Sequence, residues 1–160
     1  MVKCIAGIQV AFSERVLSLL SGFRQRVLHA DEAGGILLGQ HALRRYQAPV
    51  EQAVLVTKAS IPTSRDRSDR HSFIRDAETA QIIVDHEHHN SAGRTTYLGE
   101  WHTHPERVAT PSGRDRRMIA RAFRENDLNT DFLLLVILGT EEDYFGLYDG
   151  SSLRGVHMQV

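Results

Sequence analysis

The spacing at which hydrophobic residues recur changes several times along the chain. Each change marks the start of an expected helix or strand. Apolar residues at helical spacing follow Ser13, a favourable N-cap, and predict a helix through about Leu28. A second amphipathic helix is predicted from about Ile74 to Asn90, and a third begins at Ser112 in S-G-R-D-R-R-M-I-A-R-A-F-R. The polar segment P-T-S-R-D-R-S-D-R-H has no hydrophobic period and is expected to be a loop.

Apolar runs between and after these helices predict strands. The runs are A-G-G-I-L-L-G-Q-H-A-L, Ala53 to Ala59, T-T-Y-L-G-E-W, Asp131 to Leu138, and Asp143 to Tyr148. The last two are expected to pair as a hairpin across Gly139-Thr140-Glu141-Glu142. The order of helices and strands indicates a mixed α/β sheet flanked by helices, with crossovers too irregular for a doubly wound fold.

Composition narrows the class of protein. The chain has 160 residues and 41% hydrophobic content, enough for one domain over residues 1–160 but not for two comfortable ones. Its net charge of −1 gives no electrostatic reason to expect nucleic acid or an anionic membrane as partner. The longest apolar run, Phe132 to Leu138, is far shorter than the roughly twenty residues of a membrane span, and M-V-K-C-I-A-G-I lacks a signal-peptide layout. We therefore expect a soluble, cytoplasmic protein with a protein or small-molecule substrate.

The single cysteine limits the chemistry further. Cys4 excludes an internal disulfide and any thiolate-rich metal site. No electropositive side chains surround it in the sequence, so it is a poor candidate for a nucleophile.

The segment E-W-H-T-H-P-E-R-V-A-T-P-S-G-R-D contains the candidate chemistry. His102 and His104 are two residues apart, so on a strand both imidazoles project from the same face. Pro105 ends the strand, and the helix that follows can bring Asp115 back towards them. Two histidines and one aspartate leave the fourth tetrahedral position of a zinc ion for water, which is typical of a catalytic site.

Several residues of this segment have a plainer interpretation. Ser112 and Asp115 also spell S-x-x-D, a capping box that only satisfies free amides at a helix N-terminus. Glu100 shares the strand face of the histidines, and it is a rival for general base or ligand. Trp101 and Thr103 alternate onto the opposite face and are expected to pack in the core.

Two further groups were considered as sites. His86 and His89 are one helical turn apart and could hold a metal, but their spacing is not that of H-E-x-x-H, and a solvated helix end is the preferred interpretation. The arginines Arg65, Arg67 and Arg70 are expected to form a solvated face, with a grip on an extended substrate tail as the alternative.

The pattern H-x-H-P, six residues, then S-x-x-D, with an upstream glutamate before G-G-I-L-L-G, resembles the JAB/MPN metalloproteases, also called the JAMM family. It is carried here by Glu32, His102, His104, Pro105, Ser112 and Asp115, within a resemblance that spans roughly residues 13 to 145. The resemblance implies a mixed, largely antiparallel curved sheet flanked by helices. It also implies one zinc ion on His102, His104 and Asp115.

The same resemblance implies roles for the two remaining polar residues. Glu32 would take a proton from water and pass it to the departing amine. Ser112 would donate its hydroxyl to the oxyanion that forms in the reaction, and would not be a nucleophile.

The wider stretches Y-L-G-E-W-H-T-H-P-E and D-R-H-S-F-I-R resemble a narrower prokaryotic branch, which includes JAB isopeptidases of CBASS anti-phage operons. That likeness implies hydrolysis of the amide bond that joins the C-terminus of a cyclic-nucleotide synthase to its target. A sulfur-carrier or other ubiquitin-like protein as substrate is the alternative within the same chemistry. A metal-free scaffold of the MPN type is the alternative outside it.

Overall fold

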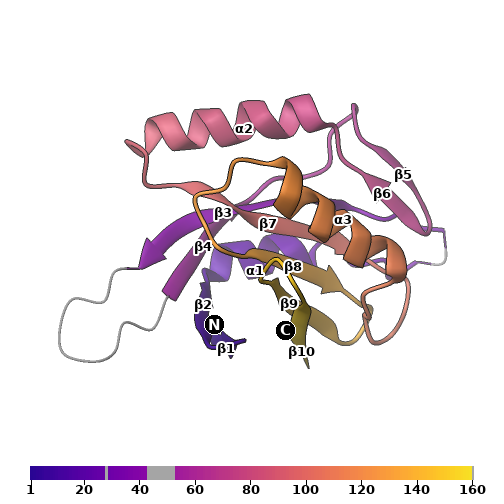
Figure 1. Cartoon of the computed structure of the whole chain (residues 1–160). Coiled ribbons are helices and arrows are strands. Elements are labelled where there is room, and N and C mark those ends of the chain that lie inside the picture. The colour runs from indigo at the N-terminus through magenta and orange to yellow at the C-terminus, as the bar shows by residue number, and fades with distance from the viewer. Residues whose placement is uncertain (28, 43–52, 160) are drawn as a thin grey trace.

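A computed structural model of the chain describes residues 1–27, 29–42 and 53–159. Within these residues the fold is mixed α/β, with three helices and one large curved sheet (Figure 1). The helices are α1 (Glu14–Ser21), α2 (Ala77–Asn90) and α3 (Gly113–Glu125). The strands of the sheet, in spatial order, are β1 (Val2–Ile5), β2 (Ile8–Phe12), β4 (Ala53–Ala59), β3 (Gly34–Ala42), β7 (Thr96–Thr103), β8 (Leu133–Leu138), β9 (Asp143–Tyr148) and β10 (Leu153–Met158). A separate hairpin consists of β5 (Arg67–Asp69) and β6 (Ser72–Ile74).

The sheet confirms the predicted fold class. Neighbouring strands pair antiparallel except for β2 with β4 and β7 with β8, so the sheet is mixed and largely antiparallel. All the predicted strands are present, and β4 and β9 have the predicted bounds. Among the described helices, none is both long and apolar enough to cross a membrane.

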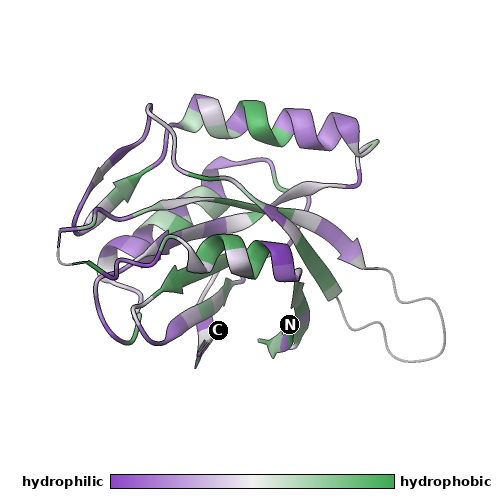
Figure 2. Cartoon of the chain, turned by 180° about the vertical axis from the view of Figure 1, so that it is seen from behind, coloured by the Kyte–Doolittle hydropathy of each residue, from purple (hydrophilic) through white to green (hydrophobic). Residues whose placement is uncertain are grey.

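Strand β8 organises the core because it is buried on both faces, which explains its uninterrupted apolar sequence. Leu134 and Val136 belong to the cluster that contains the buried side chains of α1. Leu133 and Leu135 point the other way and pack with Ile119 of α3. Figure 2, seen from the side of α1, shows hydrophobic residues on that helix and on the strands beneath it. The helices therefore cover both faces of the sheet, with α2 and α3 on the face opposite α1 (Figure 1).

The prediction for the first helix was wrong at its end. Ser13 does cap it, because its Oγ accepts the Val16 N–H at 3.3 Å, but the helix ends at Ser21 instead of continuing to about residue 28. Gly22 closes the last turn through N–H contacts to carbonyls of that turn, and Arg24 then leaves the helix to form a buried ion pair with Asp143. Leu28, the expected helix end, and Leu43, at the end of the glycine-marked run, lie outside the described residues.

The expected loop of residues 62–71 was wrong in part, because β5 lies inside it and pairs with β6 just beyond it. Strands of three residues with exposed side chains give no hydrophobic period, so the sequence carried no signal for them. The edge strands β1 and β10, and β2 beside β1, were also missed. β1 and β10 are mostly exposed along their length, which weakens the alternation that would predict them.

Candidate metal centre

The end of strand β7 places two histidines on the same face: His102 lies in the strand, and His104 follows its last residue, Thr103. His102 and His104 are 6% and 8% exposed, so both imidazoles are buried. Trp101 and Thr103 face the other side, as predicted: the Trp101 Nε1–H donates to the Ser60 carbonyl at 3.0 Å, and the Thr103 hydroxyl oxygen accepts the Ala33 N–H at 2.9 Å. The opposite face therefore anchors the strand that presents the histidines.

Helix α3 supplies the carboxylate of the centre from its first turn. The Ser112 N–H donates to Asp115 Oδ2 at 2.6 Å, and the Asp115 N–H donates to Ser112 Oγ at 3.2 Å, which is a complete capping box. The S-x-x-D segment therefore does form the capping box of the plainer interpretation. It does not exclude a second role, because a carboxylate has lone pairs to spare and Asp115 also faces both histidines.

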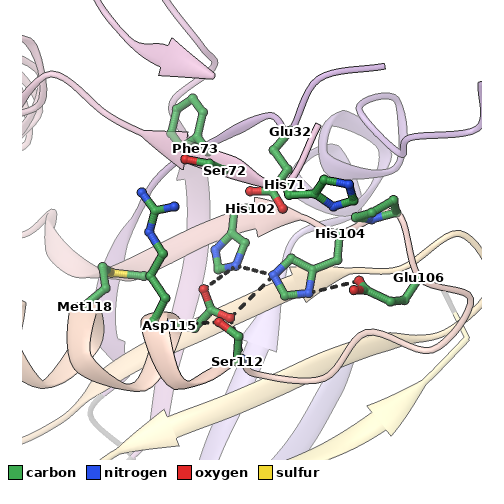
Figure 3. A pocket seen from close by; sticks show the side chains of 12 residues that line it. Glu32, His71, Ser72, Phe73, His102, His104, Glu106, Ser112, Asp115 and Met118 are labelled. Atoms are coloured by element: carbon green, nitrogen blue, oxygen red, sulfur yellow. Dashed lines mark hydrogen bonds and ion pairs between the residues drawn. The ribbon is translucent and has the colours of Figure 1, made fainter. Parts of the chain in front are cut away.

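The three side chains meet at distances that suit a metal ion (Figure 3). His102 Nε2 lies 3.1 Å from His104 Nε2 and 3.2 Å from Asp115 Oδ1, and His104 Nε2 lies 3.5 Å from Asp115 Oδ2. Donor atoms held at about 2.0–2.1 Å in a tetrahedron are about 3.3 Å apart. The spacing of these nitrogen and oxygen atoms therefore fits a tetrahedral ion such as zinc. Among the described residues they are the group that could hold a metal.

The electrostatics of the group favour an ionised carboxylate. Burial alone would raise the pKa of Asp115, but hydrogen bonds from His102 and His104 outweigh it and hold that pKa well below its usual range. For His104, burial works to lower the pKa, while the Asp115 hydrogen bond and charge raise it on balance. A buried anion thus faces two imidazoles, which is the charge arrangement that a divalent cation would use.

Glu32 lies on the other side of the histidines from Asp115 and lines the same cavity (Figure 3). Its position follows from strand pairing, because the Thr103 N–H donates to the Ala33 carbonyl at 2.8 Å and so holds the neighbouring Glu32 beside β7. Glu32 is 7% exposed, and its burial raises the pKa of the carboxyl from 4.5 to about 7. The His104 charge lowers that pKa, and nearby acidic groups raise it further.

The rival glutamate, Glu100, is engaged elsewhere. Arg75 Nε donates to both of its carboxylate oxygens, at 3.0 and 3.1 Å, and the Tyr97 hydroxyl donates to Oε1 at 2.6 Å. This pairing neutralises the charge and uses the lone pairs that a base or a metal ligand would need. Glu100 is therefore held in an ion pair with Arg75 and a hydrogen bond with Tyr97. It is a weaker candidate than Glu32 for the general base or for a metal ligand.

The histidines His86 and His89 lie on α2, outside the centre, whereas Arg67 and Arg70 belong to the β5–β6 hairpin beside the cavity. His86 Nε2 lies 2.8 Å from Asn90 Nδ2 on an exposed turn of α2, and His89 is exposed, so both belong to a solvated helix end. Of the arginines, Arg65 pairs with Asp76 and Glu78.

One wall of the cavity was not anticipated from the sequence. The β5–β6 hairpin contributes His71, Ser72 and Phe73, which lie above the histidines in Figure 3. The segment D-R-H-S-F carries part of the family resemblance, but its first three residues are expected in a loop, and no local pattern indicates that the segment turns towards the centre. The cavity has a volume of about 140 Å³.

Comparisons with known proteins point to one family. The family described as prokaryotic homologs of the JAB domain matches residues 13–148. A Pseudomonas aeruginosa protein named CD-NTase/cGAS isopeptidase is 36% identical, over 89% of this chain and 87% of its own length. A Vibrio cholerae protein of the same name is 33% identical, over 86% and 80%. A probable metalloprotease of Sinorhizobium fredii is 32% identical, over 69% and 63%.

Among solved structures, a Desulfitobacterium hafniense protein determined in solution has a TM-score of 0.61. It is 18% identical and the match covers 92% of this chain and 89% of that one, so the likeness concerns the fold alone.

Proposed function

Because this chain belongs to the family of prokaryotic homologs of the JAB domain, we propose that it is a zinc-dependent isopeptidase. Its substrate is a protein conjugate in which the C-terminus of a cyclic-nucleotide synthase is joined to a target through an amide bond. The observation that carries the proposal is the convergence of His102, His104 and Asp115 at spacings that suit a tetrahedral ion, with Glu32 on the open side.

His102, His104 and Asp115 would hold the zinc ion, since two buried imidazole nitrogens and one carboxylate are a ligand set of catalytic zinc sites. When bound, zinc supplies a Lewis acid that activates water and polarises a carbonyl. The single cysteine, Cys4, is exposed and plays no part.

Glu32 acts as general base and then as general acid. In the metal-free protein its pKa is raised to about 7, so the carboxyl group can accept a proton near neutral pH and give it up again. Water transfers one proton to Glu32 while its oxygen bonds to the scissile carbonyl carbon. The carbon–nitrogen bond then breaks, and the amine leaves with the proton that Glu32 returns.

Ser112 stabilises the negative charge that develops on the carbonyl oxygen. Its Oγ accepts the Asp115 N–H, so the hydroxyl proton remains free to point into the cavity. Loss of one such donor typically costs about 2.7–4 kcal/mol of transition-state stabilisation. The capping box thus orients the hydroxyl as well as capping the start of α3.

The substrate class is supported by the relatives and by the shape of the cavity. Three relatives at 29–36% identity are named for isopeptidase action on CD-NTase or cGAS proteins. A cavity of about 140 Å³ accepts an extended chain, as a flexible C-terminal tail would provide. The partner is therefore a protein with an extended C-terminal tail.

A cleavage assay tests the proposal. The purified, zinc-loaded protein is incubated with a CD-NTase whose last residue is fused to a reporter protein, and the products are weighed by mass spectrometry. A single cut after the last residue of the synthase is expected, and Glu32→Ala should make no cut while retaining zinc. A parallel fusion of a sulfur-carrier protein separates the substrates: cleavage of that fusion alone would overturn the assignment to the synthase.

A further inference from the structure

Gln25 is a buried glutamine outside the metal centre. It connects the segment that leads to Glu32 with the β5–β6 hairpin. It is 4% exposed, and it follows α1 after the turn at Gly22. Its Nε2 donates to the Ala30 carbonyl at 2.9 Å and to the Arg70 carbonyl at 3.0 Å. Ala30 lies two residues before the proposed general base, and Arg70 lies in the turn of the β5–β6 hairpin.

Both partners of this amide fix its orientation. Two carbonyl oxygens can only accept hydrogen bonds, so the NH₂ group, and not the amide oxygen, must face them. The Oε1 atom of Gln25 has no hydrogen-bond partner among the described residues and is buried. The two carbonyl oxygens that Gln25 bonds therefore set the orientation of its amide group.

Two further contacts join the same segments. The Glu32 N–H donates to the Asp69 carbonyl at 2.8 Å. Gly34 lies directly under the ring of Phe73, since an ideal Cβ at this glycine would overlap that ring. The hairpin is thus held to the segment around Glu32 at several points, and Gln25 bonds to both.

We propose that Gln25 is a positioning residue that fixes Glu32 and the β5–β6 hairpin against each other, so that the base and the cavity wall keep one geometry. The importance of this for catalysis rests on the role proposed above for Glu32. The metal ligands come from β7, from His104 just after it and from α3, and the two hydrogen bonds of the Gln25 amide go to neither element. We therefore expect the loss of Gln25 to disturb the base more than metal binding.

Amide hydrogen exchange tests the connection without relying on any activity. Gln25→Met keeps the length of the side chain and removes both donors. Exchange should become faster in residues 30–34 and in residues 67–73 together, while β7 and α3 keep their protection. Gln25→Glu should have a larger effect, because it places carboxylate oxygens against two carbonyl oxygens. Faster exchange in only one of the two segments, or in neither, would overturn the proposal.

Kinetics then test the consequence for Glu32. Gln25→Met should lower kcat by roughly 10- to 100-fold, as loss of residues that orient a catalytic group commonly does, with zinc affinity within about twofold of wild type. The limb of the pH–rate profile that belongs to Glu32 should also move. A lower melting temperature with an unchanged kcat and pH profile would reduce Gln25 to a structural role.

A matched control comes from the far end of strand β3. Gln40 also donates through its amide, to Thr95 Oγ1 at 3.4 Å, but it contacts no wall of the cavity. Gln40→Met should leave kcat and the pH profile unchanged. If the wild-type protein cleaves no conjugate, the proposed function fails, and the exchange experiment still decides whether Gln25 joins the two segments.

Discussion

The raised pKa of Glu32 makes the stability of the metal-free protein depend on pH in a way that one substitution can remove. The folded state raises this pKa from 4.5 to about 7, so it binds the proton more tightly than the unfolded chain does. The Glu32 contribution to the free energy of unfolding therefore falls as pH rises from about 4.5 to about 7, and stays low above that. At about 1.4 kcal/mol per pH unit, the effect is on the order of 3 kcal/mol at most.

Glu32→Gln removes the titrating group and keeps its shape. In the metal-free protein the variant should match the wild type near pH 4.5 and should be more stable near pH 8 by about 2–3 kcal/mol. Urea unfolding at both pH values, followed by circular dichroism, measures the difference. Glu125→Gln is the control, because this carboxylate is exposed and its ion pair with Arg121 on the surface of α3 is worth about 0.5 kcal/mol or less.

Equal stabilities of the wild type and Glu32→Gln at both pH values would refute this reasoning. Glu32 would then be hydrated in solution, and its role as a base that works near neutral pH would lose its physical basis. A variant that is less stable than the wild type at pH 8 would refute it as well, since the folded state would then favour the ionised form.

Three further predictions concern the metal and the framework. Asp115→Asn should lose zinc, measured by metal analysis after dialysis, because the buried anion that faces the imidazoles is gone; full zinc content would contradict the ligand set. Arg24→Met leaves Asp143 buried without its cation, and should lower the free energy of unfolding by about 3–5 kcal/mol in urea titration. Gly34→Ala should lower it by about 1–3 kcal/mol, because the new Cβ would overlap the Phe73 ring; an unchanged urea midpoint would show that the hairpin can move aside.

The elements that carry the centre were predictable because their signals are local. The spacing of His102 and His104 on a strand, and the S-x-x-D start of a helix at Ser112, are properties of a few neighbouring residues. The fold class followed from the order of hydrophobic periods. The all-buried strand β8 was also visible, because burial on both faces leaves a continuous apolar run.

The features of the site that could not be predicted from the sequence depend on contacts between segments that are far apart in the chain. The place of Glu32 beside His104 follows from the pairing of Ala33 with Thr103, seventy residues away in the chain. The engagement of Glu100 by Arg75 is a similar distant contact, so the two glutamates could not be separated on physical grounds beforehand. The β5–β6 hairpin is too short and too exposed to give a period, although it forms one wall of the cavity.

Zinc-dependent isopeptide hydrolysis is tested most directly by the intact mass of a defined conjugate. In it, a CD-NTase is joined through its C-terminal carboxyl group to a lysine of a second protein. The conjugate is incubated with metal-free protein and with the same protein reloaded with zinc. We expect only the zinc-loaded sample to release both proteins at their unmodified masses, which together exceed the mass of the conjugate by one water. Release by the metal-free protein, or an intact conjugate after full zinc loading, would contradict it.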